Sequence, residues 1–84
     1  MVRKEVKSSN IKSIGFEDGT LEIEFVNKSI YRYKPIYPEM NIEAIYNYAI
    51  SPECKSVGSY LHLNVIKSKS FQWTRVDPLS KLIP

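Results

Sequence analysis

The sequence predicts an α+β fold in which a three-stranded antiparallel meander is followed by two short helices and by a short C-terminal strand or extended arm. Three observations carry this prediction. The pair Asp18-Gly19 separates two β-rich runs, residues 21–25 alternate between apolar and acidic side chains, and apolar residues recur at helical spacing between Pro38 and Pro52.

The meander is expected to begin with a strand over residues 11–16. The Asp-Gly pair then favours a tight hairpin, because both residues tolerate positive φ. In the next strand, Leu21, Ile23 and Phe25 share one face, while the glutamates between them share the other. A second tight turn leads to a third strand over residues 30–33, which is rich in β-branched and aromatic side chains.

The solvated face of the meander is expected to carry cross-strand ion pairs. Glu22 and Glu24 point to one side of their strand, and Arg32 and Lys34 share one side of the next. Exposed pairs of this kind contribute a few tenths of a kcal/mol each, so we expect them to serve the surface.

The first helix is expected to start at the N-cap Asn41 and to stop by Ser51, before a proline. The second is expected to start near Ser56 and to reach about Ile66. The predicted inward residues are Ile42, Ile45, Tyr46 and Ala49 in the first helix and Val57, Leu61 and Val65 in the second, with Tyr60 as a further candidate. Residues 71–76 alternate again, which predicts the last strand or arm.

The 84 residues are expected to form one domain over residues 1–84, with a core over about 6–77 and a flexible tail over 78–84. The single Cys54 cannot form an internal disulfide, and the N-terminal residues lack an apolar signal-peptide core, so we expect a cytoplasmic location. Since no uncharged run approaches the roughly 20 residues of a membrane helix, no membrane association is expected.

The formal net charge of +3 is unevenly distributed along the chain. Residues 1–12 and residues 66–84 each carry a surplus of +3, whereas the segment between them carries −3. If the two ends lie together, they form one basic patch that attracts phosphate groups; if they lie apart, the charge serves solubility.

The sequence offers little for catalysis. His62 is the only histidine and Cys54 the only cysteine, so paired metal ligands are missing and no metal is expected. These two residues are formally a base and a nucleophile, but nothing nearby reliably supplies an orienting carboxylate. Glycine-rich nucleotide-binding motifs and hydrolase motifs are also missing, so we expect a protein that is no enzyme and has no cofactor.

Tyr31 and Tyr33 are two residues apart and therefore emerge on the same side of a strand, opposite Arg32. On an open sheet face, two such rings stack unpaired bases. Beneath the helices, they fill the core instead, which is the interpretation that the need for a buried sheet face favours.

These elements resemble the KTSC domain, a small module found alone in bacterial and phage-type proteins and at the C-terminus of some lysyl-tRNA synthetases. The resemblance runs from residue 6 to about residue 66, and residues 30–33 carry the YxY motif at the centre of the family. Lys28 stands where the second turn of the family usually has glycine. The resemblance implies the fold, suggests RNA binding because of the attachment to a synthetase, and implies no catalytic residues.

Our leading hypothesis is a small non-catalytic module that binds RNA or single-stranded nucleic acid. Its candidate phosphate-binding residues are Arg3, Lys4, Lys7, Lys67, Lys69 and Arg75. Its candidate stacking residues are Tyr31, Tyr33 and Trp73.

The alternative is a protein–protein interaction module, either a homodimer or a phage-type accessory protein that binds a host factor. Its candidate contacts are a sheet edge, Tyr37, Trp73 and the apolar stretch over residues 79–83, which has no obvious place in so thin a core.

Overall fold

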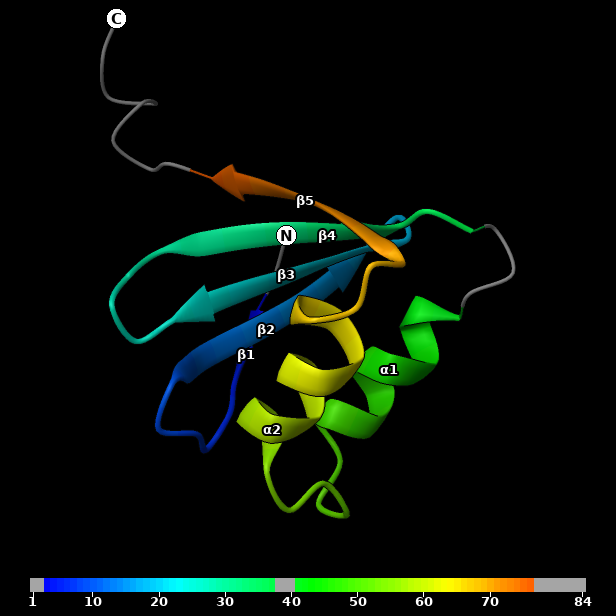
Figure 1. The fold of residues 1–84 in the computed structure, drawn as a ribbon. Coiled ribbons are helices and arrows are strands. Elements are labelled where there is room, and N and C mark those ends of the chain that lie inside the picture. The colour runs from blue at the N-terminus through cyan, green and yellow to red at the C-terminus, as the bar shows by residue number, and fades with distance from the viewer. Residues whose placement is uncertain (1–2, 38–40, 77–84) are drawn as a thin grey trace, which may run out of the picture.

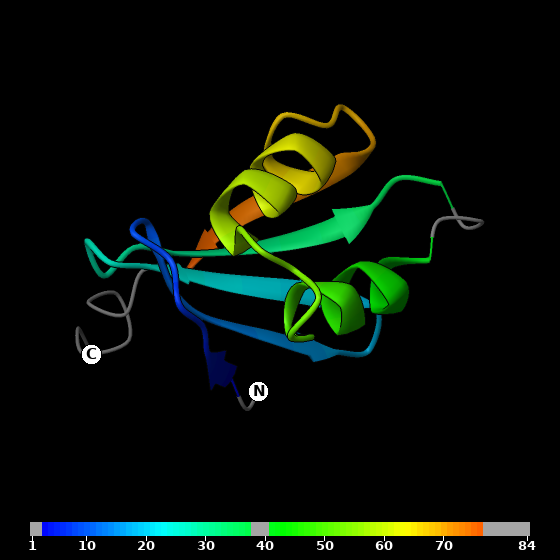
Figure 2. The same ribbon diagram turned by 90° about the horizontal axis from the view of Figure 1, so that it is seen from below.

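The computed structural model describes residues 3–37 and 41–76. Five strands form one antiparallel sheet in the order β1-β2-β3-β4-β5, so that β1 and β5 are its two edges. The strands are β1 Arg3–Glu5, β2 Ile11–Glu17, β3 Thr20–Phe25, β4 Ile30–Pro35 and β5 Phe71–Val76. The helices are α1 Ile42–Ala49, α2 Val57–Leu61 and the π-helix η1 His62–Ile66, and they lie on one side of the sheet (Figures 1 and 2).

The predicted three-stranded meander is the centre of this larger sheet. β2, β3 and β4 pair consecutively, and β5 pairs with β4 as a regular strand, which confirms the strand expected at the C-terminal end. β1 goes beyond the prediction: Arg3, Lys4 and Glu5 pair with the middle of β2 and extend the sheet by one short strand. The tail predicted over residues 78–84 lies outside the described residues.

The core lies between the sheet and the helices. Leu21 and Ile23 of β3 are fully buried there, as the alternation predicts, and they belong to the same core cluster as Leu61 and Val65 of the helical layer. Phe25 is only half-buried, because it stands at the end of β3 where the helical layer stops. This position makes Phe25 available to the surface described below.

The helix starts are capped as the sequence predicts. The Asn41 side chain accepts a hydrogen bond from the Ala44 amide at 3.0 Å, and the Ser56 hydroxyl accepts one from the Ser59 amide at 3.3 Å. After Leu61 the second helix widens into η1, where the amide of Lys67 donates to the carbonyl of His62 five residues earlier. π-helical turns are rare in proteins, and many of those that do occur lie at functional sites.

Both tight turns of the meander use left-handed backbone. Asp18 and Gly19 have φ of 51° and 72° in the first turn, and Lys28 has φ of 75° in the second. Asn27 supports the second turn by accepting a hydrogen bond from the Ser29 amide at 3.0 Å. Lys28 therefore holds, at a steric cost, the conformation that glycine adopts freely.

Replacing Gly19 with valine is expected to lower the free energy of unfolding by about 1–2 kcal/mol, because a β-branched residue resists positive φ. No described atom lies within 4 Å of the added Cβ position, so the backbone alone sets this cost. Urea unfolding measures it. Gly19→Asn is the control and is expected to lose less, since asparagine tolerates this conformation; equal losses for the two variants contradict the prediction.

Candidate nucleic-acid interface

A cluster of aromatic side chains lies on the helix side of the sheet, where β3 ends and β4 begins. The Tyr31 ring contacts Phe25 edge-on with ring centroids 5.7 Å apart, and it contacts Trp73 in the same manner at 5.6 Å. The guanidinium carbon of Arg75 lies 5.9 Å from the centre of the Tyr31 ring. We call Phe25, Tyr31, Trp73 and Arg75 the aromatic ledge.

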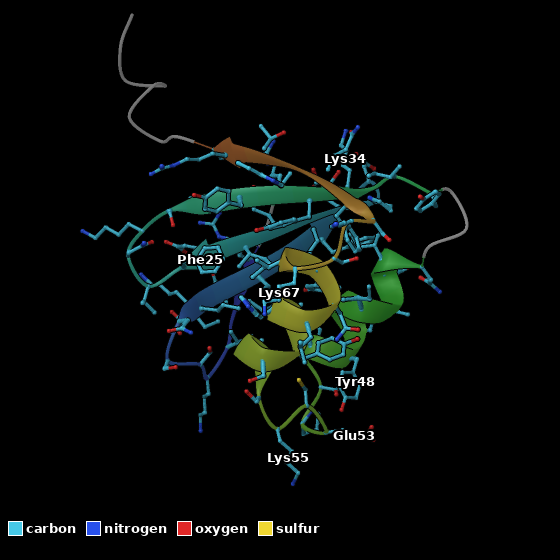
Figure 3. The ribbon with its side chains drawn as sticks, in the orientation of Figure 1. Phe25, Lys34, Tyr48, Glu53, Lys55 and Lys67 are labelled. Atoms are coloured by element: carbon cyan, nitrogen blue, oxygen red, sulfur yellow. The ribbon has the colours of Figure 1, made fainter. Side chains whose placement is uncertain are left out.

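Strand register assembles the aromatic ledge. Tyr31 pairs with Ile23 on one side and with Arg75 on the other, while Trp73 pairs with Tyr33. Side chains of directly paired residues share a face, so all of these point toward the helix side. The helices cover the other half of that face (Figure 1), and Phe25 lies beside the edge of the helical layer (Figure 3). Trp73 consequently keeps 64% of its surface exposed.

The structure brings together three of the nine candidate binding residues: Tyr31, Trp73 and Arg75. Tyr33 does not join them, because it is 5% exposed and belongs to the core. Burial, together with the neighbouring Tyr31, raises the pKa of the Tyr33 phenol. Of the two interpretations of the tyrosine pair, the core interpretation therefore holds for Tyr33, which has no free face for stacking.

The basic residues of the two chain ends lie at different edges of the sheet. The N-terminal candidates, on and just after β1, are Arg3, Lys4 and Lys7. Arg75 lies on β5, at the opposite edge of the sheet. Neighbouring strands are about 4.8 Å apart, so the four spacings from β1 to β5 separate the two edges by roughly 19 Å. Lys67 and Lys69 are exposed in the segment between η1 and β5, and Lys67 lies on the helix side (Figure 3). Of the C-terminal group, Arg75 thus lies in the aromatic ledge, whereas Lys69 precedes the opposite end of β5.

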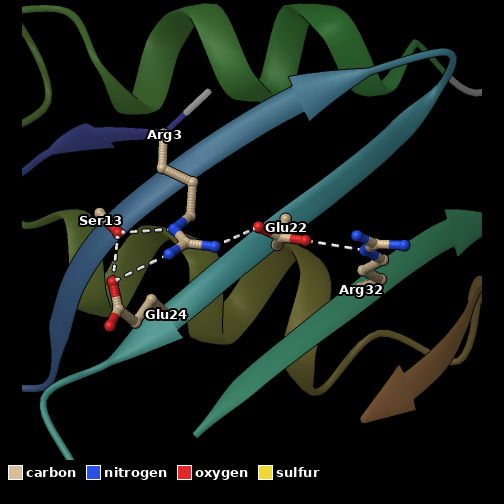
Figure 4. Close-up of polar contacts among 5 residues, drawn as sticks. All are labelled: Arg3, Ser13, Glu22, Glu24 and Arg32. Atoms are coloured by element: carbon tan, nitrogen blue, oxygen red, sulfur yellow. Dashed lines mark hydrogen bonds and ion pairs between the residues drawn. The ribbon is translucent and has the colours of Figure 1, made fainter. Parts of the chain in front are cut away.

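The opposite face of the sheet carries an ion-pair network in place of a helix. Arg3 reaches from β1 over β2 to bind Glu22 on β3, and the Arg32 Nε donates to the other oxygen of Glu22 at 2.7 Å (Figure 4). Gly15 is the β2 residue that pairs with both Arg3 and Glu22, so no side chain stands in this path. Arg3 also contacts Glu24 at 3.5 Å. Arg3 is therefore engaged within the domain.

Glu22 is 3% exposed, although it is ionisable and lies on a face without helices. Burial alone would raise the pKa of its carboxyl, but hydrogen bonds from Arg32 and Arg3, together with their positive charges, hold the pKa below its ordinary value. The predicted cross-strand pairing is thus confirmed for Glu22 with Arg32. The expectation of an exposed surface pair is wrong for Glu22, because its carboxylate is buried between Arg3 and Arg32. Lys34, in contrast, forms no ion pair with a carboxylate of the described residues.

Within residues 3–37 and 41–76, no three side chains of the His, Cys, Asp and Glu types lie together as metal ligands do. None of the helices found in those same residues combines the length and the apolar character that a membrane span needs.

The fold and this surface define a small α+β domain with one antiparallel sheet and one helical layer. The family model of the KTSC domain matches residues 7–71, and the chain belongs to the KTSC domain family. The chain is also similar to an uncharacterised protein of Stutzerimonas stutzeri (strain A1501), with 30% identity over 79 residues that cover 92% of this chain and 100% of that protein. Phe25 and Tyr31 lie inside the matched segment, whereas Trp73 and Arg75 follow it.

Proposed function

We propose that this domain binds single-stranded RNA or another single-stranded nucleic acid, without catalysis, through the aromatic ledge. The observation that carries the proposal is the exposed Trp73, which is held against Tyr31 beside the Arg75 guanidinium. Proteins hold single strands by stacking bases on aromatic rings and by attracting the phosphates with basic groups. The aromatic ledge offers both within one stretch of sheet, and the attachment of related domains to lysyl-tRNA synthetases favours RNA.

The charges around the aromatic ledge suit this role. Arg75 belongs to it, and Lys67 directly follows η1 on the helix side of the sheet. Lys69 precedes the Phe71 end of β5, which is the opposite end from Arg75. The acidic turn at Glu17 and Asp18 lies at the opposite end of β3 from Phe25, so it stands away from a strand bound on the aromatic ledge.

Binding of a labelled single-stranded RNA is expected to weaken linearly with the logarithm of the salt concentration. The double variant Lys67→Glu/Lys69→Glu is expected to bind more weakly and to reduce the size of the salt slope by about 1.4, because each lost phosphate contact on a single strand removes about 0.7. Fluorescence anisotropy titrations between about 50 and 200 mM salt measure both quantities.

The matched control is Lys4→Glu/Lys7→Glu, which makes the same change of charge at the β1 edge. Equal losses for the two double variants indicate attraction by net charge alone and contradict a binding surface near β5. An affinity that does not change with salt contradicts the proposed function altogether.

A protein–protein interaction module is the second candidate, and β5 is the observation that favours it. This strand forms one edge of the described sheet over the six residues Phe71–Val76, and an edge strand presents unpaired backbone groups on its outer side. Two copies pairing edge to edge would form a homodimer. Sedimentation over a range of protein concentrations tests this: a dimer supports the candidate, and a monomer throughout contradicts the homodimer.

A further inference from the structure

We propose that a groove beside the aromatic ledge receives one base of the bound strand, and that adenine is the base its polar side chains fit. This inference rests on the proposed function. The groove has a volume of about 280 Å³. One of its walls is formed by Asn10, Ile11 and Phe25, and the other is formed by the α2–η1 segment. Pockets for drug-sized ligands usually hold roughly 300–1,000 Å³, so this one suits a single flat group.

The groove has an apolar floor and a polar rim. Ile11 is fully buried, and Phe25 and Ile66 are half-buried. The exposed side chains around them are Asn10, Ser59 and His62. Among the described residues that line the groove, none is acidic. This combination matches a base, whose faces are apolar, whose edge forms hydrogen bonds, and which is attached to a phosphate chain.

The rim side chains are free to bind. The backbone of Asn10 is held on both sides, since its amide donates to the Ser8 hydroxyl at 3.3 Å and its carbonyl accepts from the Val26 amide at 2.9 Å. The side chains of Asn10, Ser59 and His62 form no hydrogen bond with another described residue. An asparagine amide offers an acceptor and a donor side by side, which is the pattern that pairs with an adenine edge.

Two features fix the walls of the groove relative to each other. A Cβ added to Gly58 would stand 3.0 Å from the Ser8 hydroxyl oxygen, so α2 sits directly on the turn that carries Asn10. His62 begins η1, and its carbonyl accepts the five-residue hydrogen bond from Lys67 at 2.8 Å. The π-helical turn therefore begins at His62, the residue of the second helix whose ring lines the groove.

Phe25 joins the groove to the aromatic ledge. Its ring lines the groove and also contacts Tyr31, which in turn contacts Trp73. A strand that stacks a base on Trp73 and follows the aromatic ledge toward β3 therefore brings a neighbouring base to the groove. Stacking on the aromatic ledge tolerates any base, whereas hydrogen bonding in the groove selects one.

The test compares oligoadenylate and oligouridylate RNA of equal length and at equal salt, with wild type and Asn10→Asp. Wild type is expected to bind oligoadenylate more tightly, and Asn10→Asp is expected to lose at least about fivefold of that affinity while retaining its binding of oligouridylate. The control Asn47→Asp makes the same charge change at an exposed position of α1, outside the groove. The ring resonances of His62, the only histidine, are expected to shift when oligoadenylate is added.

The outcomes separate the groove from the aromatic ledge. If both RNAs bind equally, Asn10→Asp has no more effect than Asn47→Asp, and Trp73→Ala still weakens binding, then the groove inference is overturned and the proposed function stands. If wild type binds neither RNA, both are overturned. The groove inference is supported if wild type prefers oligoadenylate, Asn10→Asp removes this preference, and Asn47→Asp leaves it unchanged.

Discussion

Replacing Trp73 with alanine is expected to weaken the binding of single-stranded RNA by roughly 5- to 150-fold, because a base stacked on an aromatic side chain contributes about 1–3 kcal/mol. Trp73 is the most exposed aromatic residue of the aromatic ledge, and Tyr31 contacts it edge-on. Titrations of labelled RNA at one fixed salt concentration measure the change. Since the substitution alters no charge, the salt slope is expected to stay the same.

Two further variants sharpen this prediction. Trp73→Phe keeps a flat ring and is expected to retain part of the lost affinity. Tyr37→Ala removes another exposed aromatic side chain, 52% exposed, that follows β4 away from the aromatic ledge. An equal loss of affinity for Tyr37→Ala and Trp73→Ala, or no loss for Trp73→Ala, contradicts stacking on the aromatic ledge.

Replacing Glu22 with glutamine is expected to lower the free energy of unfolding at pH 7 by about 1–3 kcal/mol, because two arginines lose a charged, buried partner. We expect the lower part of this range, because the Arg3 and Arg32 side chains are 28% and 45% exposed and water screens their charges.

The effect of Glu22 is expected to depend on pH. Its pKa in the folded state lies below its ordinary value, so its contribution is fully present above that ordinary value and is lost as the pH falls through the folded pKa. Urea unfolding at pH 7 and at about pH 3 measures the difference between wild type and Glu22→Gln, which is expected to shrink at the lower pH. Glu53→Gln, at an exposed loop position, is the control. A difference that is equal at both pH values contradicts this role.

Local patterns in the sequence predict the centre of the fold. The Asp18-Gly19 turn, the apolar alternation in β3 and the caps at Asn41 and Ser56 all act over a few residues, and each is found where it is expected. β1 has no such signal. Its three residues are polar or charged, and Arg3 is held in the sheet by a carboxylate nineteen positions away.

The aromatic ledge could be predicted only in part. The candidate list includes Tyr31, Trp73 and Arg75, but their contact depends on the register between β4 and β5, which are separated by the whole helical layer in sequence. Phe25 is absent from that list because it continues the alternating apolar pattern of Leu21 and Ile23, which is typical of core residues. Its exposure follows from where the helices end, and no local pattern in β3 indicates that.

The intrinsic fluorescence of Trp73 tests binding at the aromatic ledge most directly, because Trp73 is the only tryptophan in the chain. A single-stranded RNA that stacks on this ring is expected to quench its emission in a saturable way, and added salt is expected to reverse the quenching. Unchanged emission at low salt, under conditions where labelled RNA is bound, would place the nucleic acid elsewhere on the domain and contradict the aromatic ledge as its binding surface.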